Sequence, residues 1–283
     1  MQTGIKYILI SNLFSLLVEV SVKALTDIPF YFIAFYRSIV VTFICLGYLF
    51  LKKIPVLGNE RKLLLTRGIT GTVALVLYFM TLQNLPLALA VTLQYLSPLF
   101  AVFFLSLLSK SIPKNLEMIS LFLSFLGVIL LNELDLSESW VYTTLGLLSA
   151  VFSGLAYTNI SRLSKTDNTV VIMLYFSATT LIAVGPYCAF RWQENFSSQN
   201  YVILFLVGIS SYVTQYYVTK AYQTASATLI APIYYLNLVF ASLIGYLAWD
   251  EVITKTMLIG MLLIISGNLL INIKKQELST FSN

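Results

Sequence analysis

Two charged side chains, Glu19 and Arg37, lie within long apolar segments of this 283-residue sequence. A charge in an apolar environment is unfavourable unless it is paired or hydrated, so such residues indicate a functional site. The Glu19 carboxylate can bind a cationic group of a solute or a coupling proton, and the Arg37 guanidinium can bind a solute carboxylate. Two structural interpretations stay open: the residues form a buried ion pair that fixes helix packing, or Lys23 and Arg37 extend to the outer lipid headgroups.

The spacing of polar residues around Glu19 predicts one helix face. Asn12, Ser15, Glu19 and Lys23 follow one another at steps of three, four and four residues. At about 100° per residue these positions share one side of a helix, which we expect to face the protein interior. Glu19 and Arg37 lie at the same distance from the outer ends of two consecutive predicted helices, about 10 to 12 Å deep. Equal depth makes the two residues a candidate ion pair.

The other candidates for solute contact are amides and tyrosines along the predicted spans. Tyr212 and Gln215 belong to the longest polar stripe, which also contains Ser211 and Thr219. Hydrogen bonding between helices is the alternative explanation of such a stripe, and packing is the alternative for each tyrosine. Proline frees carbonyl groups on the preceding turn, so prolines within a span predict kinks that suit gates. The remaining candidates are Tyr78, Gln94, Tyr175, Tyr234 and Asn237 for binding, and Pro98 and Pro232 for gating.

The composition predicts that lipid surrounds these residues. The chain is 58% hydrophobic and 10% charged, with a mean hydropathy of +0.86, which leaves too little polar surface for a soluble globule. A bilayer core about 30 Å thick needs roughly 20 apolar residues per helix. The apolar runs therefore predict an all-α membrane protein of ten transmembrane helices, at residues 5–25, 29–51, 63–84, 87–109, 113–132, 141–163, 170–191, 200–222, 226–249 and 254–273.

The distribution of basic residues predicts the orientation of these helices. With a cytoplasmic N-terminus, thirteen Lys and Arg residues, Arg67 among them, fall on the inner side, and only Lys23, Arg191 and Lys255 fall on the outer side. Cytoplasmic flanks of membrane helices carry such an excess of positive charge. Both termini are therefore expected in the cytoplasm, and the expected location is the inner membrane of a bacterium.

The chain also resembles itself at an offset of 139 to 140 residues. Tyr36 aligns with Tyr175 and Tyr78 with Tyr217, and the alignment continues through Ala88 and Ala227 and through Tyr95 and Tyr234. A nearly constant offset over a whole half indicates an internal repeat. We expect one five-helix repeat over residues 1–135 and a second over 136–283. Five helices per half give the halves opposite orientations, a plan that is typical of secondary transporters.

Three segments resemble the drug/metabolite transporter superfamily, EamA type. They are LPLALAVTLQYLSPLFAVFF at 85–104, ASATLIAPIYYLNLVFASLIGYLAWDE at 225–251 and FYR at 35–37. The resemblance implies ten helices in two inverted halves around a central cavity, and transport of amino acids, nucleotide-linked compounds or other metabolites. The chain departs from the family pattern at Ser111, where an acidic residue is common, while Glu251 keeps its counterpart. Asn237 stands where the family has a proline, and Pro98 keeps the matching place.

These observations predict a secondary active transporter that moves a small polar metabolite, such as an amino acid or a nucleoside-like compound, by alternating access. Exchange of S-adenosyl compounds or other nucleotide metabolites is the alternative within the family. A membrane receptor or scaffold without transport is the alternative from another class. Enzymatic chemistry is not expected, because the chain has no histidine, one deep carboxylate and two isolated cysteines.

The expected partners follow from the same prediction. They are a small-molecule substrate, the lipid bilayer and a coupling proton or counter-solute. The sequence implies neither nucleic acid nor a cofactor nor a metal, and the chain is expected to act as a monomer or a homodimer. The net charge of +5 reflects basic residues in loops rather than a surface for acidic partners.

Overall fold

The structure is a computed structural model of the 283-residue chain. Most of the chain is described with its side chains. The described residues are 2–108, 139–191, 196–225 and 227–266, with isolated positions between 119 and 130, and only the backbone is described at 2, 3, 5, 139 and 227–236.

All of the regular elements in the described residues are helices. Seven helices there are long and apolar enough to cross a membrane, so the chain is a multi-pass membrane protein. The bounds are α1 Gln2–Ala24, α2 Phe30–Leu51, α3 Arg61–Asn84, α4 Leu87–Gln94, α5 Ser97–Leu108, α7 Ser139–Leu163, α8 Thr169–Phe190, α9 Ser198–Thr224 and α10 Ala227–Trp249, followed by a helix at Lys255–Ser266.

The described helices agree with the predicted spans within a few residues, with one difference. The predicted span 87–109 contains two helices, α4 and α5, instead of one. The predicted span 113–132 lies mostly outside the described residues, so the total of ten helices stays a prediction.

Local sequence signals fix where several helices begin. Pro29 and Pro86 occupy the N-cap positions of α2 and α4, where the missing N–H of proline costs no helical hydrogen bond. Asn168 and Ser197 cap α8 and α9, since the Asn168 side chain accepts from the Val170 amide at 2.9 Å and Ser197 caps α9 in the same way. These caps satisfy amide groups that would otherwise be unpaired at the helix ends.

The break between α4 and α5 follows from Pro98. Proline has no amide hydrogen, so it cannot donate to the carbonyl of Gln94 one turn earlier. The Ser97 hydroxyl donates to that carbonyl instead, at 2.7 Å, and the helical pattern resumes with Phe100 donating to Leu96 at 3.0 Å. The predicted kink at Pro98 is therefore confirmed, and the break places Tyr95 at a bend in the middle of a membrane span.

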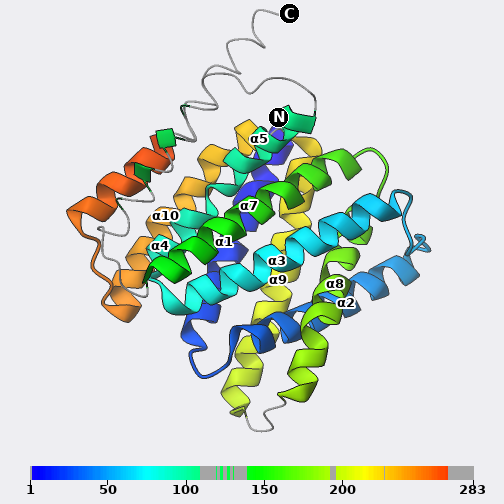
Figure 1. The fold of residues 1–283 in the computed structure, drawn as a ribbon. Helices are drawn as coiled ribbons and strands as arrows, with labels where there is room; N and C mark the ends of the chain where they lie inside the picture. Colours follow the sequence, from blue (N-terminus) through cyan, green and yellow to red (C-terminus); the bar gives the residue numbers. More distant parts are fainter. Residues whose placement is uncertain are drawn as a thin grey trace, which may run out of the picture.

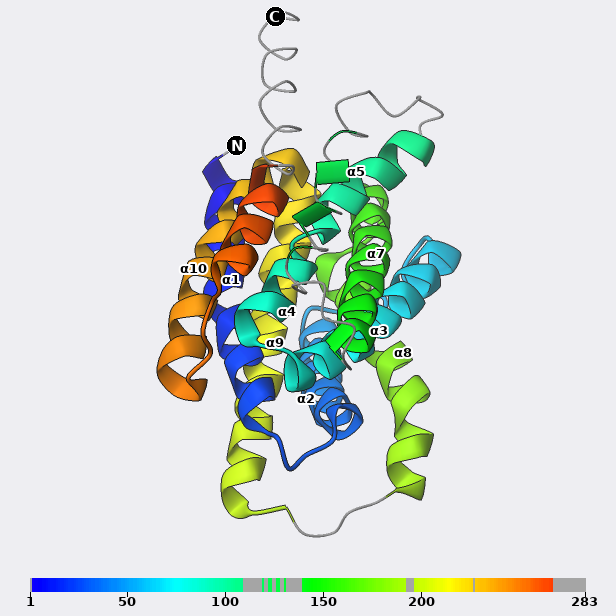
Figure 2. The same cartoon turned by 60° about the vertical axis from the view of Figure 1, so that its left-hand side comes forward.

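Helices related by the sequence offset make equivalent contacts. α3 packs along α7 and α9 packs along α1, while α2 and α8 pack on each other (Figure 1). An offset of about 140 residues relates α1 to α7, α2 to α8 and α3 to α9, so each of these contacts maps onto its counterpart. Figure 2 shows α1 beside α9 and α10 from the second half. The core is therefore formed between the halves rather than within each half.

In each half, a glutamine side chain forms hydrogen bonds to the first loop between helices. Gln83 Nε2 donates to the carbonyls of Leu25 at 2.9 Å and Ile28 at 2.8 Å, in the loop between α1 and α2. Gln223 Nε2 approaches the Asp167 carbonyl at 3.4 Å, in the loop between α7 and α8. Gln83 and Gln223 are 140 residues apart, so the sequence repeat is also a repeat of hydrogen bonding.

Candidate functional site

A cavity of about 120 Å³ lies where the helices of the two halves meet. A single water molecule needs about 10–15 Å³ measured in this way, so the cavity has room for several waters or for part of a small solute. Helices α1, α2, α3 and α4 line it from the first half, and α7, α8 and α9 line it from the second. Its polar lining residues are Ser11, Ser15, Glu19, Arg37, Arg67, Tyr78, Gln94, Tyr95, Ser153, Tyr157, Ser211, Thr214 and Gln215.

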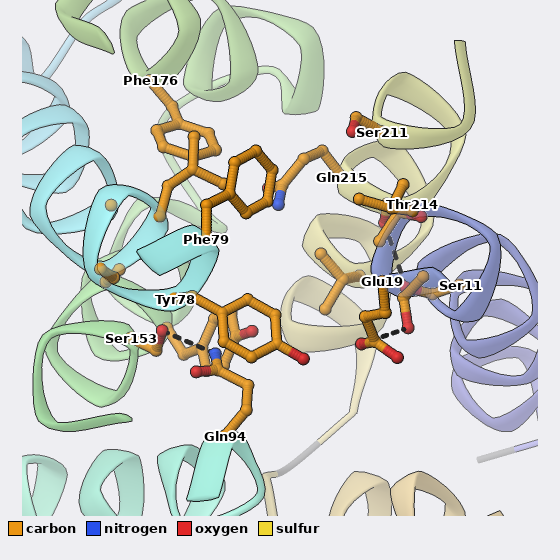
Figure 3. A pocket seen from close by; sticks show the side chains of 18 of the residues that line it. Ser11, Glu19, Tyr78, Phe79, Gln94, Ser153, Phe176, Ser211, Thr214 and Gln215 are labelled. Carbon is orange, nitrogen blue, oxygen red and sulfur yellow. Dashed lines mark hydrogen bonds between the residues drawn. The ribbon is translucent and has the colours of Figure 1, made fainter. Parts of the chain in front are cut away.

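Glu19 forms the acidic end of the cavity, and its side chain is held in a fixed position. The Ser15 hydroxyl donates to Glu19 Oε1 at 3.3 Å, and Asn237 Nδ2 donates to Glu19 Oε2 at 3.1 Å. Asn237 also donates to the Ser15 oxygen at 3.1 Å, so α10 secures both residues of α1. Figure 3 shows the Tyr78 hydroxyl directed toward the same carboxylate. These groups orient the Glu19 carboxyl group, and none of them is a cation.

Two arginines and an aromatic ring form the cationic end. The guanidinium carbon of Arg37 lies 5.1 Å from the centre of the Phe176 ring, and that of Arg67 lies 4.6 Å from it. Arg67 Nη2 also approaches Gln215 Oε1 at 3.4 Å. A cation is attracted to the face of an aromatic ring, and this attraction offsets part of the cost of removing it from water. Phe176 thus holds two positive charges as near neighbours.

Neither guanidinium has an anionic partner in the described part of the chain. Arg37 and Arg67 are each only 2% exposed. Nη1 of Arg37, and Nε and Nη1 of Arg67, are buried without a hydrogen-bond acceptor. Buried polar groups are nearly always hydrogen-bonded, so donors left open on two cations in a cavity indicate a site for an acceptor group.

The structure does not pair Glu19 with Arg37, although both line the same cavity. The extension of Lys23 and Arg37 to the lipid headgroups is also wrong. Arg37 is buried, and Lys23 Nζ forms an ion pair with Glu251 Oε1 at 2.7 Å. The physical reason is that Glu251, which follows α10, brings a carboxylate within ion-pair distance of Lys23. Lys23 is therefore a structural residue, and the Glu19 carboxyl group has no cationic partner in the described part of the chain.

The Lys23–Glu251 pair is part of a larger network of polar contacts. Lys23 Nζ donates to the Leu85 carbonyl at 2.7 Å, at the end of α3. The Leu87 amide, at the start of α4, donates to Glu251 Oε2 at 2.8 Å. Trp249 lies below the ammonium, with Nζ 5.6 Å from its ring centre. Each charge thus has both an ionic partner and a backbone partner, and the network joins α1, α4 and α10.

Gln94 is fixed as a wall of the cavity. Its Nε2 donates to Ser153 at 2.9 Å, and its Oε1 accepts from Ser149 at 3.2 Å (Figure 3). Ser149 also approaches the Ala74 carbonyl at 2.8 Å, which ties α7 to α3. Because α7 contacts both its amide nitrogen and its amide oxygen, the Gln94 side chain is held in one position and shapes the cavity.

A glycine in α3 provides the space for the aromatic contact. A Cβ atom at Gly71 would lie 2.9 Å from the nearest ring atom of Phe176 and would also contact the Arg67 guanidinium. Glycine is therefore required here by the close approach of α3 to Phe176.

We expect Gly71→Ala to lower solute affinity by a factor of about five or more, because overpacking costs about 1–3 kcal/mol and displaces the ring and the guanidinium. Gly47→Ala is the matched control, since a Cβ at Gly47 has nothing within 4 Å. Uptake in proteoliposomes measures both variants. Equal uptake by the two would show that the contact between Phe176 and Arg67 does not matter for solute binding.

The predicted residues divide into three groups. Glu19, Arg37, Tyr78, Gln94 and Gln215 line the cavity, and Asn237 reaches it through Glu19. Tyr175 and Tyr212 do not line it: the Tyr175 hydroxyl donates to the Leu57 carbonyl at 2.8 Å, and Tyr212 stacks on Tyr216. The side chains of Tyr234 and Pro232 lie outside the described residues, although α10 runs through both positions.

Arg67 and Phe176 are the important residues that the sequence interpretation missed. The charge distribution placed Arg67 among the basic residues of the inner side, and Phe176 was not among the predicted site residues. One signal was present: Gly68 and Gly71 beside Arg67 predict that another helix comes close to α3 at this level.

Comparison with known proteins shows which family and which transporters the chain resembles. The model of the EamA-like transporter family matches residues 2–133 and again residues 140–273. The pseudopaline exporter CntI of Pseudomonas aeruginosa is 30% identical over 261 residues, which cover 91% of each chain. The S-adenosylmethionine uptake transporter of Rickettsia prowazekii is 25% identical over 174 residues, covering 54% of this chain and 59% of that protein.

The fold also matches a protein of known crystal structure. The two chains superpose with a TM-score of 0.65 over 98% of this chain and 97% of the other. Their sequences are 17% identical, so this match supports the fold alone.

Proposed function

The chain belongs to the EamA-like transporter family, and from this premise we propose that it carries a small zwitterionic metabolite across a membrane. The solute has at least one carboxylate and one ammonium group, as an amino acid has. One observation carries the proposal: a buried cavity between the halves offers a carboxylate at one end and guanidinium groups at the other, with no ion pair between them. Figure 3 shows Glu19 and Tyr78 well separated from Phe176 and Gln215.

We propose ten helices in two inverted repeats, residues 1–135 and 136–283, with both termini in the cytoplasm of a bacterium. The contact of α3 with α7 is equivalent to the contact of α9 with α1, which supports this arrangement. The equivalent hydrogen bonds of Gln83 and Gln223 support it as well. In that orientation the Lys23–Glu251 network lies toward the outer side of the membrane, and Arg67 lies toward the inner side.

Alternating access is the proposed mechanism. The halves move relative to each other around the cavity, and the outer network forms in one arrangement and opens in the other. The driving force is an ion gradient, exchange against a second solute or the gradient of the solute itself. The break at Pro98 gives α4 and α5 freedom to move at the level of the cavity.

A counterflow experiment tests the proposal. The purified protein is first screened by thermal melting against amino acids, nucleosides and S-adenosyl compounds, because a ligand that binds the folded state raises its melting temperature. The best ligand is then placed unlabelled inside proteoliposomes, and uptake of its labelled form is measured. We expect the internal solute to stimulate labelled uptake, since a carrier returns faster when it is loaded.

Other outcomes of the melting and counterflow measurements would indicate a different class of membrane protein. A channel gives labelled flux that internal solute does not stimulate. A receptor or scaffold gives a melting shift and no flux. Preferential stabilisation by S-adenosylmethionine would favour the alternative that the relative in Rickettsia prowazekii suggests, an exchanger of S-adenosyl compounds.

A further inference from the structure

The charges that line the cavity do not balance. Counted as formal charges, Arg37 and Arg67 contribute two positive units and Glu19 one negative unit, so the lining has a formal net charge of one positive unit. The Lys23 and Glu251 charges cancel in their own ion pair outside the lining. All three lining charges are at most 5% exposed, so bulk water does not screen them.

A solute with one ammonium and one carboxylate leaves this imbalance unchanged. A loaded carrier passes through a state in which the solute is closed off from water, and an uncompensated charge is unfavourable in such a state. A solute with one ammonium and two carboxylates brings the site to neutrality. The electrostatics therefore distinguish between solutes that all fit the general description of a zwitterion.

We propose that the cavity binds an anionic amino acid type of solute, with one ammonium on Glu19 and two carboxylates on Arg37 and Arg67. This inference rests on the proposed transport function and adds the substrate class. The separation of Glu19 from Phe176 along the cavity requires that the ammonium and the carboxylates point in opposite directions (Figure 3).

The open donors of the arginines fit this composition. Arg37 Nη1 and Arg67 Nε and Nη1 lack acceptors in the described structure. Arg67 Nε and Nη1 lie on different edges of the guanidinium, so the open donors of this side chain face acceptor oxygens from two directions. Arg37 Nη1 donates to no group of the described structure and is available to the second carboxylate. The donors outnumber what a single carboxylate uses when it binds one arginine with both oxygens.

Three small probes separate the contributions of each charge. L-Glutamate has one ammonium and two carboxylates, L-glutamine lacks the second carboxylate, and glutarate lacks the ammonium. We expect glutamate to bind at least about tenfold more tightly than either of the others, because each loss leaves a buried charge without its partner. Dissociation constants come from melting shifts of the purified protein at graded ligand concentrations.

Two variants assign the preferences to residues. Arg67→Gln is expected to abolish the preference for glutamate over glutamine, and Glu19→Gln is expected to abolish the preference for glutamate over glutarate. Arg61→Gln, an exposed position on the same helix, is the control that keeps both preferences. Arg37→Gln repeats the first test if Arg67→Gln does not fold.

The ligand-free melting temperature of Arg67→Gln separates binding from a structural role. Removal of a buried cation that has no anionic partner should raise the melting temperature, whereas removal of a structural residue lowers it. Equal binding of glutamate and glutamine would overturn the proposed substrate class. So would tighter binding of S-adenosylmethionine, which has a single carboxylate and two positive charges. Neither result would contradict the proposed transport function. Absence of both melting shifts and counterflow across the whole screen would overturn the transport function itself.

Discussion

Glu19→Gln is expected to reduce solute uptake by a factor of about 30 or more, while the protein still folds and inserts. Removal of one partner from a buried charge contact costs about 2–5 kcal/mol, which corresponds to that loss in affinity. Glutamine keeps the size of the side chain and an oxygen that accepts from Asn237, so the packing of α1 against α10 is retained. Uptake into proteoliposomes measures the effect, and size-exclusion chromatography reports folding.

Two companion variants make the Glu19 result interpretable. Glu60→Gln removes an exposed carboxylate at the start of α3 and should leave uptake unchanged. Glu19→Asp keeps the charge but withdraws it by one methylene group, so intermediate uptake is expected. Normal uptake kinetics in Glu19→Gln would exclude Glu19 from solute and proton binding and leave it a structural residue.

Lys23→Met and Glu251→Gln are each expected to destabilise the folded protein by about 3 kcal/mol. Loss of one partner from a buried ion pair leaves the other charge uncompensated, which typically costs 3–5 kcal/mol, and the two side chains are only 11% and 12% exposed. The double variant should cost less than the sum of the single variants, because both remove the same interaction. Unfolding in mixed micelles with increasing denaturing detergent measures these free energies.

The charge-swapped variant, Lys23→Glu with Glu251→Lys, tests the network more sharply. We expect it not to recover stability. A lysine at 251 cannot accept from the Leu87 amide, and a glutamate at 23 cannot donate to the Leu85 carbonyl. Lys255→Met, at an exposed position nearby, serves as the control and should have little effect. Full recovery in the swapped variant would mean that the ion pair alone matters and the backbone contacts do not.

Much of the helical framework was predictable because its signals are local. Hydrophobic length gave the spans, and prolines and capping residues such as Asn168 gave the boundaries. A kink at Pro98 was also predictable, since a missing amide has its effect within one turn. The split of one span into α4 and α5 was the part that local signals left open, because a proline in a membrane helix produces either a bend or a break.

The site was only partly predictable, because contacts between distant segments have no local signature. The deep positions of Glu19, Gln94, Gln215 and Asn237 followed from helix depth and polarity. The partner of Lys23 did not, because Glu251 lies far away in the sequence and reaches α1 only through the packing of α10. Asn237 departs from the family proline, and the structure gives that departure a physical reason: its side chain holds Glu19.

Arg67 shows a limit of interpretation by charge counting. A basic residue a turn and a half into a helix satisfies the rule for cytoplasmic flanks as well as a loop residue does. Whether it extends to the headgroups or turns into the protein depends on what lies opposite. Here α3 meets α8 at Gly71, and the Phe176 ring receives the guanidinium.

The shared aromatic ring bears on the kinetics at the two faces of the membrane. Arg37 and Arg67 come from the first half of the chain, whereas Phe176 and Gln215 come from the second. In the proposed alternating access, movement of the halves separates the cations from their ring, so the outward and inward sites are chemically different. Half-saturation concentrations for entry and exit should then be unequal. Such a protein transports the solute faster in one direction than in the other at the same solute concentration. The final accumulation ratio still depends only on the gradients that drive transport.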